Sequence, residues 1–235
     1  MTQPSPLTDQ NFVIIVAGGT GTRMRSVVPK QFILLNDLPV LMHTLLAFDR
    51  SAVQPRAILV LHSNFHDHWK NLCVKYNFTL PHLLVAGGKT RFHSVQNGLE
   101  CINCTDNAII AVHDAVRPLT NTKIIEASFN VARELSNAIT AVKSRDSVRQ
   151  MIGDKSISLK RDEIYLVQTP QTFNAGLLKR AYAQSYNESF TDDASVVEEY
   201  GEVINIIPGD HYNIKITFPE DIVIAELILS KKATD

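Results

Sequence analysis

The feature that most constrains the fold of this chain is an apolar run that ends abruptly in a glycine-rich turn. Residues 12–16 are all apolar, and Gly18, Gly19 and Gly21 follow almost at once. Such a pattern predicts a buried strand that leads into a tight loop. Glycine tolerates positive φ and has no Cβ to keep a ligand away from the backbone. Successive backbone N–H groups in such a loop form a concavity that binds anions.

Two cations accompany this loop. Arg23 lies within it and Lys30 follows a few residues later, so the segment is typical of a polyphosphate site, the alternative being a tight turn with two solvated cations. A P-loop would end in Gly-Lys-Ser/Thr, which is missing here. The dinucleotide fingerprint of an oxidoreductase would place glycine at Met24, and an acid where His62 follows the second predicted strand. Both residues weaken that competing interpretation.

The composition excludes several classes of partner. The chain has 235 residues, 45% of them hydrophobic and 20% charged, with a formal net charge of −1. We therefore expect no nucleic acid and no anionic membrane as partner. No apolar run has the length of a membrane span, and the first residues do not form a signal segment. Three cysteines fit a reducing compartment, so we predict a cytoplasmic location.

Two clusters could suggest metal ligands. Cys101 and Cys104 form a lone C-x-x-C motif, and His62, His66 and His68 gather at the start of a predicted helix. A structural zinc site needs about four ligands, and neither cluster has a second group to complete it. We therefore predict packed thiols at a helix end, solvated histidines at a helix start, and no metal site built by the protein alone.

Beyond the glycine loop, predicted strands and helices alternate along the chain. This alternation predicts right-handed βαβ units and hence an α/β fold. We expect a single three-layer domain over residues 1–235 with a mainly parallel, Rossmann-like nucleotidyltransferase sheet. Ligands bind beyond the carboxyl ends of such strands, where the glycine loop and Asp114 fall. Thr191 is predicted to cap a helix that runs to residue 200. The predicted strands are 57–61, 83–85, 108–112, 138–142, 164–167 (closed by 168–171) and 203–207, and the predicted helices are 40–48, 65–76, 92–102, 122–135, 174–182, 191–200 and one from 219 onward.

Residues 145–162 break the alternating pattern. They are mostly polar, and Gly153 and Asp154 separate two short segments that alternate in polarity. This pattern predicts a β-hairpin that protrudes from the domain. Because a two-stranded hairpin is only marginally stable by itself, we expect this arm to pack on something else.

Six spaced motifs agree with one family. The glycine loop, as G-G-x-G-T-R-M followed by Pro-Lys, resembles nucleotidyltransferases that make sugar nucleotides. The whole set covers the chain from Val13 to about Leu227 and resembles the 2-C-methyl-D-erythritol 4-phosphate cytidylyltransferases. The motifs are Gly18-Gly19-Thr20-Gly21-Thr22-Arg23-Met24 with Pro29-Lys30; Ala86-Gly87-Gly88 with Arg91 and Ser94; His113-Asp114-Ala115-Val116-Arg117-Pro118; Gln168-Thr169-Pro170-Gln171; Thr191-Asp192-Asp193-Ala194-Ser195; and Asn213-Ile214-Lys215 with Pro219-Glu220-Asp221.

The resemblance implies an enzyme of isoprenoid synthesis that joins CTP and a sugar-alcohol phosphate and releases pyrophosphate. The attacking phosphate is largely dianionic at pH 7, so cations rather than a general base should carry catalysis. Mg²⁺ would be held mainly by the CTP phosphates. The resemblance also implies a homodimer. Two alternatives stay open: a ribitol-5-phosphate cytidylyltransferase, which shares most motifs, and a non-catalytic nucleotide sensor, which we would expect to lack Arg23, Lys30 or Asp114. The apolar Ala115 and Val116 favour the methyl-branched erythritol phosphate over ribitol 5-phosphate.

The family pattern also assigns roles position by position, with no protein metal ligand. Residue 161 and residue 147 would reach the partner's site from the arm. Two positions depart from the pattern, since Lys89 stands where the family often has an acid and Ser147 where it often has threonine. The catalytic set is Arg23, Lys30, Arg161 and Lys215; the nucleotide set is Ala17, Gly18, Gly19, Gly88, Lys89, Ser94 and Asp114; the alcohol-phosphate set is Asp114, Arg117, Ser147, Arg161, Thr191 and Lys215.

Overall fold

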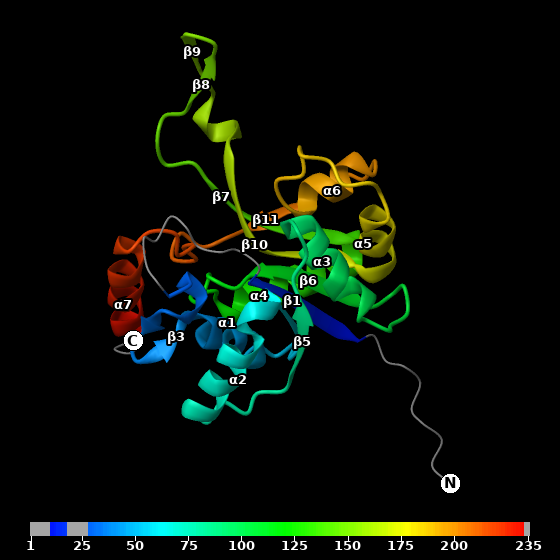
Figure 1. Cartoon of the computed structure of the whole chain (residues 1–235). Helices are drawn as coiled ribbons and strands as arrows, with labels where there is room; N and C mark the ends of the chain where they lie inside the picture. The colour runs from blue at the N-terminus through cyan, green and yellow to red at the C-terminus, as the bar shows by residue number, and fades with distance from the viewer. Residues whose placement is uncertain (1–9, 18–27, 233–235) are drawn as a thin grey trace.

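A computed structural model of the chain describes residues 10–17 and 28–232. The predictions for Gly18, Gly19 and Arg23 therefore lie outside the described residues. Figure 1 shows a central sheet with helices on both faces and a hairpin that projects away from it. Within the described ranges, no helix combines the length and the apolar character that crossing a bilayer requires.

The central sheet has seven strands in the order β11-β7-β10-β6-β1-β4-β5. β10 runs antiparallel to its neighbours β6 and β7, whereas the other neighbouring pairs are parallel. The prediction of a mainly parallel sheet is therefore confirmed. The strands are β1 (Asn11–Ala17), β4 (Arg56–Leu61), β5 (His82–Ala86), β6 (Ile109–Asp114), β7 (Asn137–Lys143), β10 (Tyr165–Asn174) and β11 (Ile206–Pro208).

Side chains alternate between two layers along the strands. In β1, Phe12 and Ile14 pack into one apolar cluster, and Val13 and Ile15 pack into the other, as the two-residue period of a strand requires. Each fully buried side chain of this size contributes about 1.5–3 kcal/mol. The predicted three-layer architecture is thus confirmed. Helices α3 (Arg91–Glu100), α5 (Ala175–Tyr182) and α6 (Asp193–Glu199) cover one face; α1 (Val40–Asp49), α2 (His66–Lys75) and α4 (Thr122–Leu135) cover the other; α7 (Glu220–Lys232) packs beside β2 (Leu34–Leu35) and β3 (Leu38–Pro39).

The strand predicted to end at residues 168–171 continues through them. β10 extends to Asn174, and its register against β7 shifts between Val167 and Gln171. Pro170 has no N–H to donate, and the shift takes it out of the regular ladder, while Thr140 Oγ1 donates to the Pro170 carbonyl at 2.7 Å. The prediction that residues 168–171 close the strand was wrong, because this irregularity lets a proline sit inside the sheet.

The cap of α6 also differs from the prediction. Asp192, not Thr191, is the N-cap: its carboxylate accepts from Ser195 N at 2.9 Å, and Ser195 Oγ accepts from Asp192 N at 3.2 Å. A carboxylate satisfies the free N–H groups of a helix start and also interacts favourably with the helix dipole. Thr191 therefore lies before the helix, and its side chain is exposed.

The predicted hairpin is present. β8 (Arg149–Ile152) pairs with β9 (Lys155–Ser158) in antiparallel register, and Gly153 at the turn has φ +58°, a conformation that glycine adopts without strain. All eight strand residues are exposed. The hairpin lies in the connection between β7 and β10, and it stands clear of the sheet (Figure 1).

Candidate active site

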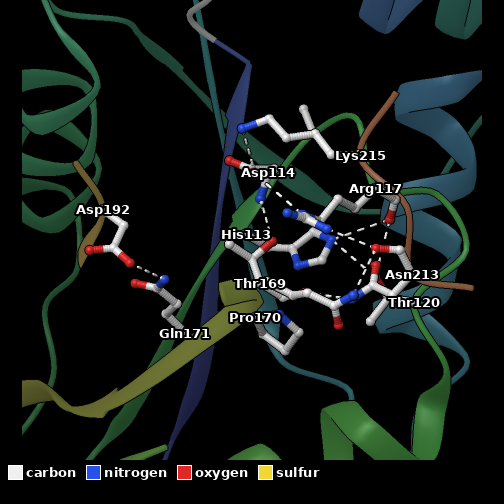
Figure 2. Close-up of polar contacts among 12 residues, drawn as sticks. His113, Asp114, Arg117, Thr120, Thr169, Pro170, Gln171, Asp192, Asn213 and Lys215 are labelled. Carbon is white, nitrogen blue, oxygen red and sulfur yellow. Dashed lines mark hydrogen bonds and ion pairs between the residues drawn. The ribbon is translucent and has the colours of Figure 1, made fainter. Parts of the chain in front are cut away.

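Asp114 is the centre of a cluster of charges at the carboxyl end of β6. Lys215 Nζ lies 2.9 Å and Arg117 Nε 3.3 Å from Asp114 Oδ2, and Arg91 Nε lies 3.8 Å from Oδ1. Figure 2 shows Lys215 and Arg117 approaching Asp114 from two segments. Asp114 and Arg117 are each only 8% exposed. The structure therefore brings together Asp114, Arg117 and Lys215, all of which the sequence assigned to the site.

The ionisation of Asp114 follows from these neighbours. Burial alone would raise the pKa of its carboxyl group, because it disfavours the charged form. The positive charges of Arg91, Lys215 and Arg117 outweigh burial and hold the pKa of Asp114 well below its usual range. The carboxylate is thus ionised at neutral pH, and it pairs with three cations at the carboxyl-terminal edge of the sheet.

Arg91 is a member of this cluster to which the sequence analysis gave no role. It is the first residue of α3 and forms two hydrogen bonds to the Asp193 carboxylate, at 2.8 and 2.5 Å. Tyr182 donates to the same carboxylate at 2.6 Å, and Asp193 is fully buried. A cation interacts unfavourably with the dipole at a helix N-terminus. An arginine at this position is therefore a feature of the sequence that indicates a compensating carboxylate from another part of the chain.

Two cavities meet at the Asp114 cluster. One has a volume of about 420 Å³ and the other of about 230 Å³. Arg91, Asp114 and Lys215 line both, so the cluster forms the shared wall. Of the predicted residues, the first cavity is lined by Ala17, Lys30, Gly88, Lys89, Ser94, Asp114 and Lys215, and the second by Asp114, Arg117, Thr191 and Lys215.

A tight loop before α3 shapes one side of the larger cavity. Gly88 N donates to Ser94 Oγ at 3.0 Å, and Ser94 Oγ donates to the Thr90 carbonyl at 2.9 Å. A Cβ on Gly88 would lie 2.5 Å from His93 Cβ, so only glycine fits. The buried hydroxyl of Ser94 therefore holds the loop, and the loop presents Gly88 and Lys89 to the cavity.

Lys30 enters the same cavity from the segment that follows the glycine loop. Its Nζ donates to the Ile216 carbonyl at 3.2 Å, one residue beyond Lys215. The neighbouring Gln31 is buried and donates to the Ala17 carbonyl at 3.3 Å. These contacts tie the segment that carries Lys30 both to the end of β1 and to the segment that carries Lys215.

Two predicted residues do not join this site within the chain. Ser147 and Arg161 lie on the arm, both exposed, and line neither cavity. Arg161 donates to the Arg145 carbonyl at 3.4 Å and lies 4.0 Å from the Asp162 carboxylate. The described chain therefore separates its predicted phosphate-binding cations: Arg117 and Lys215 are paired with the Asp114 carboxylate, whereas Arg161 lies apart from it on the arm.

Most of the residues flagged as possible metal ligands make other contacts, and Cys101 is exposed rather than packed as predicted. His62 Nδ1 accepts from Asn64 N at 3.3 Å, His66 Nε2 lies 2.9 Å from the Leu61 carbonyl, and the His68 ring packs edge-on against Phe32. Lys179 Nζ lies 3.6 Å from Cys104 Sγ. Among the described residues, no group of three or more histidine, cysteine or acidic side chains could hold a metal ion.

Comparison with known proteins gives one family throughout. The family model described as 2-C-methyl-D-erythritol 4-phosphate cytidylyltransferase matches residues 11–231. Proteins of that name from Azobacteroides pseudotrichonymphae and Porphyromonas gingivalis are each 44% identical, covering 94% and 95% of this chain and 99% and 100% of the relatives. Among solved structures, 4-diphosphocytidyl-2C-methyl-D-erythritol synthase from Anaerococcus prevotii is 29% identical, with a TM-score of 0.78 over 94% of this chain and 99% of that one.

Proposed function

The chain belongs to the 2-C-methyl-D-erythritol 4-phosphate cytidylyltransferase family, and we propose on that premise how its two cavities divide the substrates. The protein transfers CMP from CTP to 2-C-methyl-D-erythritol 4-phosphate, releasing pyrophosphate, in isoprenoid precursor synthesis. We place CTP in the larger cavity and the alcohol phosphate in the smaller one. The supporting observation is that the cavities share one wall, at Asp114 and its cations. We place the reaction in the cytoplasm, as the cysteine usage predicts.

In this arrangement, catalysis requires cations that reduce the repulsion between two negatively charged phosphates. A phosphate dianion must approach the α-phosphate of a triphosphate, and both partners are negative. Preorganised cations and N–H donors stabilise such a transition state without a general base. Lys30 in the larger cavity and Lys215 on the shared wall supply that charge, with Arg23 assigned to the same task from the sequence.

Asp114 has a positioning task in this scheme. Its carboxylate orients Lys215 and Arg117 at 2.9 and 3.3 Å, so the cations are aligned before substrate binds. A site that is already organised avoids rearranging charges during the reaction. Thr191, which also lines the smaller cavity, adds a hydroxyl for the alcohol phosphate.

We further propose Mg²⁺ as the cofactor, held mainly by the CTP phosphates. Asp114 lines both cavities, but its carboxylate is already paired with three cations. The described residues of the site therefore fit an ion that takes most of its ligands from the substrate. Mg²⁺ commonly keeps water and substrate phosphates as ligands and uses few protein groups. When bound, the ion would neutralise triphosphate charge, and Lys30 would add a positive charge to the same cavity.

We also propose that the protein is a homodimer in which the arm completes the partner's site. The hairpin exposes Met151, Ile152 and Ile157, by 66%, 57% and 45%, which is unusual for an isolated two-stranded element. A partner surface that covered them would place Ser147 and Arg161 outside their own subunit. Deleting residues 148–158 should convert a dimer into a monomer in light scattering; an unchanged dimer, or a monomeric wild type, would contradict the arrangement.

The substrate assignment is tested by pyrophosphate release with CTP and Mg²⁺. Parallel reactions contain 2-C-methyl-D-erythritol 4-phosphate or ribitol 5-phosphate. Ala115 and Val116 line the larger cavity and not the smaller one, so the expected preference rests on family membership: the erythritol phosphate should have the higher kcat/KM, by the margin that one methyl group allows. A methyl in an apolar pocket is worth about 1–3 kcal/mol, or roughly 10- to 100-fold. A preference for ribitol 5-phosphate would make the protein the related ribitol enzyme, and no turnover of either would refute cytidylyl transfer.

A further inference from the structure

Lys215 is held by a segment that has no regular secondary structure. Residues 209–217 form neither helix nor strand, between the end of β11 and the start of α7. Lys215 is 42% exposed at its side chain, yet its Nζ lies 2.9 Å from Asp114. Irregular backbone has no ladder of its own to fix it, so contacts with other elements must set the position of Lys215.

Asn213, two residues before Lys215, supplies several of those contacts, and the Ile216 N–H adds one to the Val116 carbonyl at 2.9 Å. Its side chain is fully buried. Nδ2 donates to the Thr169 carbonyl at 2.9 Å, and Oδ1 accepts from Thr120 Oγ1 at 2.9 Å. Its backbone carbonyl accepts from Arg117 Nη1 at 2.7 Å. One residue therefore joins β10, the turn after β6 and the segment that carries Lys215 (Figure 2).

The elements that Asn213 joins are also the ones that hold Asp114. Thr169 Oγ1 accepts from Asp114 N at 3.0 Å, while Arg117 contacts the Asp114 carboxylate. Asn213 thus contacts Thr169 and Arg117, which both contact Asp114. It also lies two residues before Lys215, which pairs with Asp114 as well. We infer that Asn213 is a positioning residue that sets Lys215 and Arg117 against Asp114, and thereby aligns the cations for the alcohol phosphate.

A second buried asparagine shows what a purely structural contact looks like. Asn137 is 1% exposed, donates from Nδ2 to the Val203 carbonyl at 2.9 Å, and accepts from Asn205 N at 2.8 Å. Like Asn213, it ties an irregular segment to the sheet. None of its partners lines either cavity at the Asp114 cluster. Asn137 is therefore a matched control for burial and hydrogen bonding.

The inference rests on the proposed role of Lys215 and is tested with Asn213→Asp. This isosteric change turns the N–H donor that faces the Thr169 carbonyl into an acceptor, so two oxygens would meet at a hydrogen-bonding distance. Asn137→Asp makes the same change at the control site. Lys215→Ala and the Asn213→Asp/Lys215→Ala double variant complete the set. Single-turnover CMP transfer at high enzyme concentration keeps slow variants measurable, and thermal unfolding reports the stability of each.

Asn213→Asp should lower kcat/KM for the alcohol phosphate by about 10- to 100-fold, since a misplacement near 1 Å can cost that much. Asn137→Asp should lose comparable thermal stability but change kcat/KM by less than about twofold, because the distant hydrogen bond does not enter the chemistry. On the Lys215→Ala background, Asn213→Asp should have a much smaller further effect. Two effects that multiply fully, or equal losses in both asparagine variants, would overturn the inference.

A milder change covers the case in which Asn213→Asp does not fold. Thr120→Val removes the hydroxyl that donates to Asn213 Oδ1 and keeps the size of the side chain. It should lower kcat/KM by about two- to tenfold, because Asn213 keeps its bond to Thr169, and unchanged kinetics would refute the proposal. If wild type reacts and Lys215→Ala is as active as wild type, the proposed role of Lys215 fails, which is a different result from failure at Asn213.

Discussion

The cluster at Asp114 and the arm at residues 145–162 both carry cations assigned to the same substrate phosphate, but they hold them in opposite ways. In the cluster, Arg117 is 8% exposed and is bonded to a carboxylate and to a backbone carbonyl. On the arm, Arg161 is exposed and lies 4.0 Å from the Asp162 carboxylate, which is 89% exposed. The first arrangement fixes its charge within one chain, whereas the second leaves its charge exposed on the arm.

This difference indicates two ways in which catalytic side chains are positioned, by folding of the chain itself or by contact with a partner. Buried, hydrogen-bonded charges are aligned by folding itself, whereas exposed ion pairs have median strengths of about 0–1 kcal/mol and do little to fix a side chain. The cluster should therefore be complete in a monomer. The arm should acquire its geometry only when a partner covers it. Loss of a cation from the site should therefore cost more than loss of one from the arm.

Lys30→Ala should cause the largest loss. It removes a cation that lines the larger cavity, and the fold should remain. Loss of one electrostatic donor to a transition state costs about 3–4 kcal/mol, or 10²–10³ in kcat, and Arg23→Ala should behave alike. Steady-state kinetics with circular dichroism measures both quantities. Lys160→Ala on the arm, where the amine is 81% exposed, is the control; near-normal kcat for Lys30→Ala would contradict the mechanism.

Arg161→Ala should cost less, about tenfold, because the cluster still holds the alcohol phosphate. Mixing the Arg161→Ala protein with the Lys30→Ala protein tests which subunit's site the arm serves. In a mixed dimer, the Arg161→Ala subunit keeps an intact cluster and receives an intact arm from its partner. Random pairing therefore restores about one quarter of all sites. If the arm acted on its own subunit, the mixture would show only the sum of the two separate activities.

The region around Asp114 should contribute a pH dependence to the stability of the fold through His113. Burial holds the pKa of His113, beside Asp114, at about 3, so the folded protein keeps it neutral where the unfolded chain protonates it. Stability should then fall with decreasing pH between about 6.5 and 3, by up to about 1.4 kcal/mol per pH unit from this group. His113→Gln should lose that part of the slope in urea unfolding. Equal slopes in both proteins would show that His113 titrates normally in the fold.

Glu163→Gln should have the smallest effect. Glu163 pairs with Lys160 at 3.0 Å, but both side chains are more than two-thirds exposed. Such a pair three residues apart contributes about 0.3–0.5 kcal/mol at most, so the free energy of unfolding should stay within that range. A larger loss would mean that the arm is ordered within its own subunit, contrary to the comparison above.

The sequence predicted those features that depend on neighbouring residues. Asp114 ends a strand, and Lys30 lies in the segment that follows the first strand and the glycine loop. Because the strand ends of a parallel sheet share an edge, the place of both residues in the site could be inferred. The hairpin was likewise visible from its turn residues. Strand β10 was predicted too short, because a proline within a run usually ends a strand and the compensating register shift is a tertiary feature.

The rest of the site depends on pairs that are far apart in the chain. Arg91 and Asp193 are separated by 102 positions, and Asn213 and Thr169 by 44. No local period relates such residues, so only the fold shows that they meet. For the same reason, the motif Asn213-Ile214-Lys215 identified the lysine by its chemistry, while its asparagine was given no role.

The two ends of the arm meet at its base. Lys143 and Tyr165 are direct partners in the β7–β10 ladder, and Ser144 N donates to the Ile164 carbonyl at 3.0 Å. The hairpin and its flanks are therefore an insert whose removal leaves two chain ends already side by side, at a distance that a short turn can bridge. The length and composition of residues 149–158 can therefore change through evolution without disturbing the sheet, while Ser147 and Arg161, which the sequence assigns to the site, lie nearer to its base.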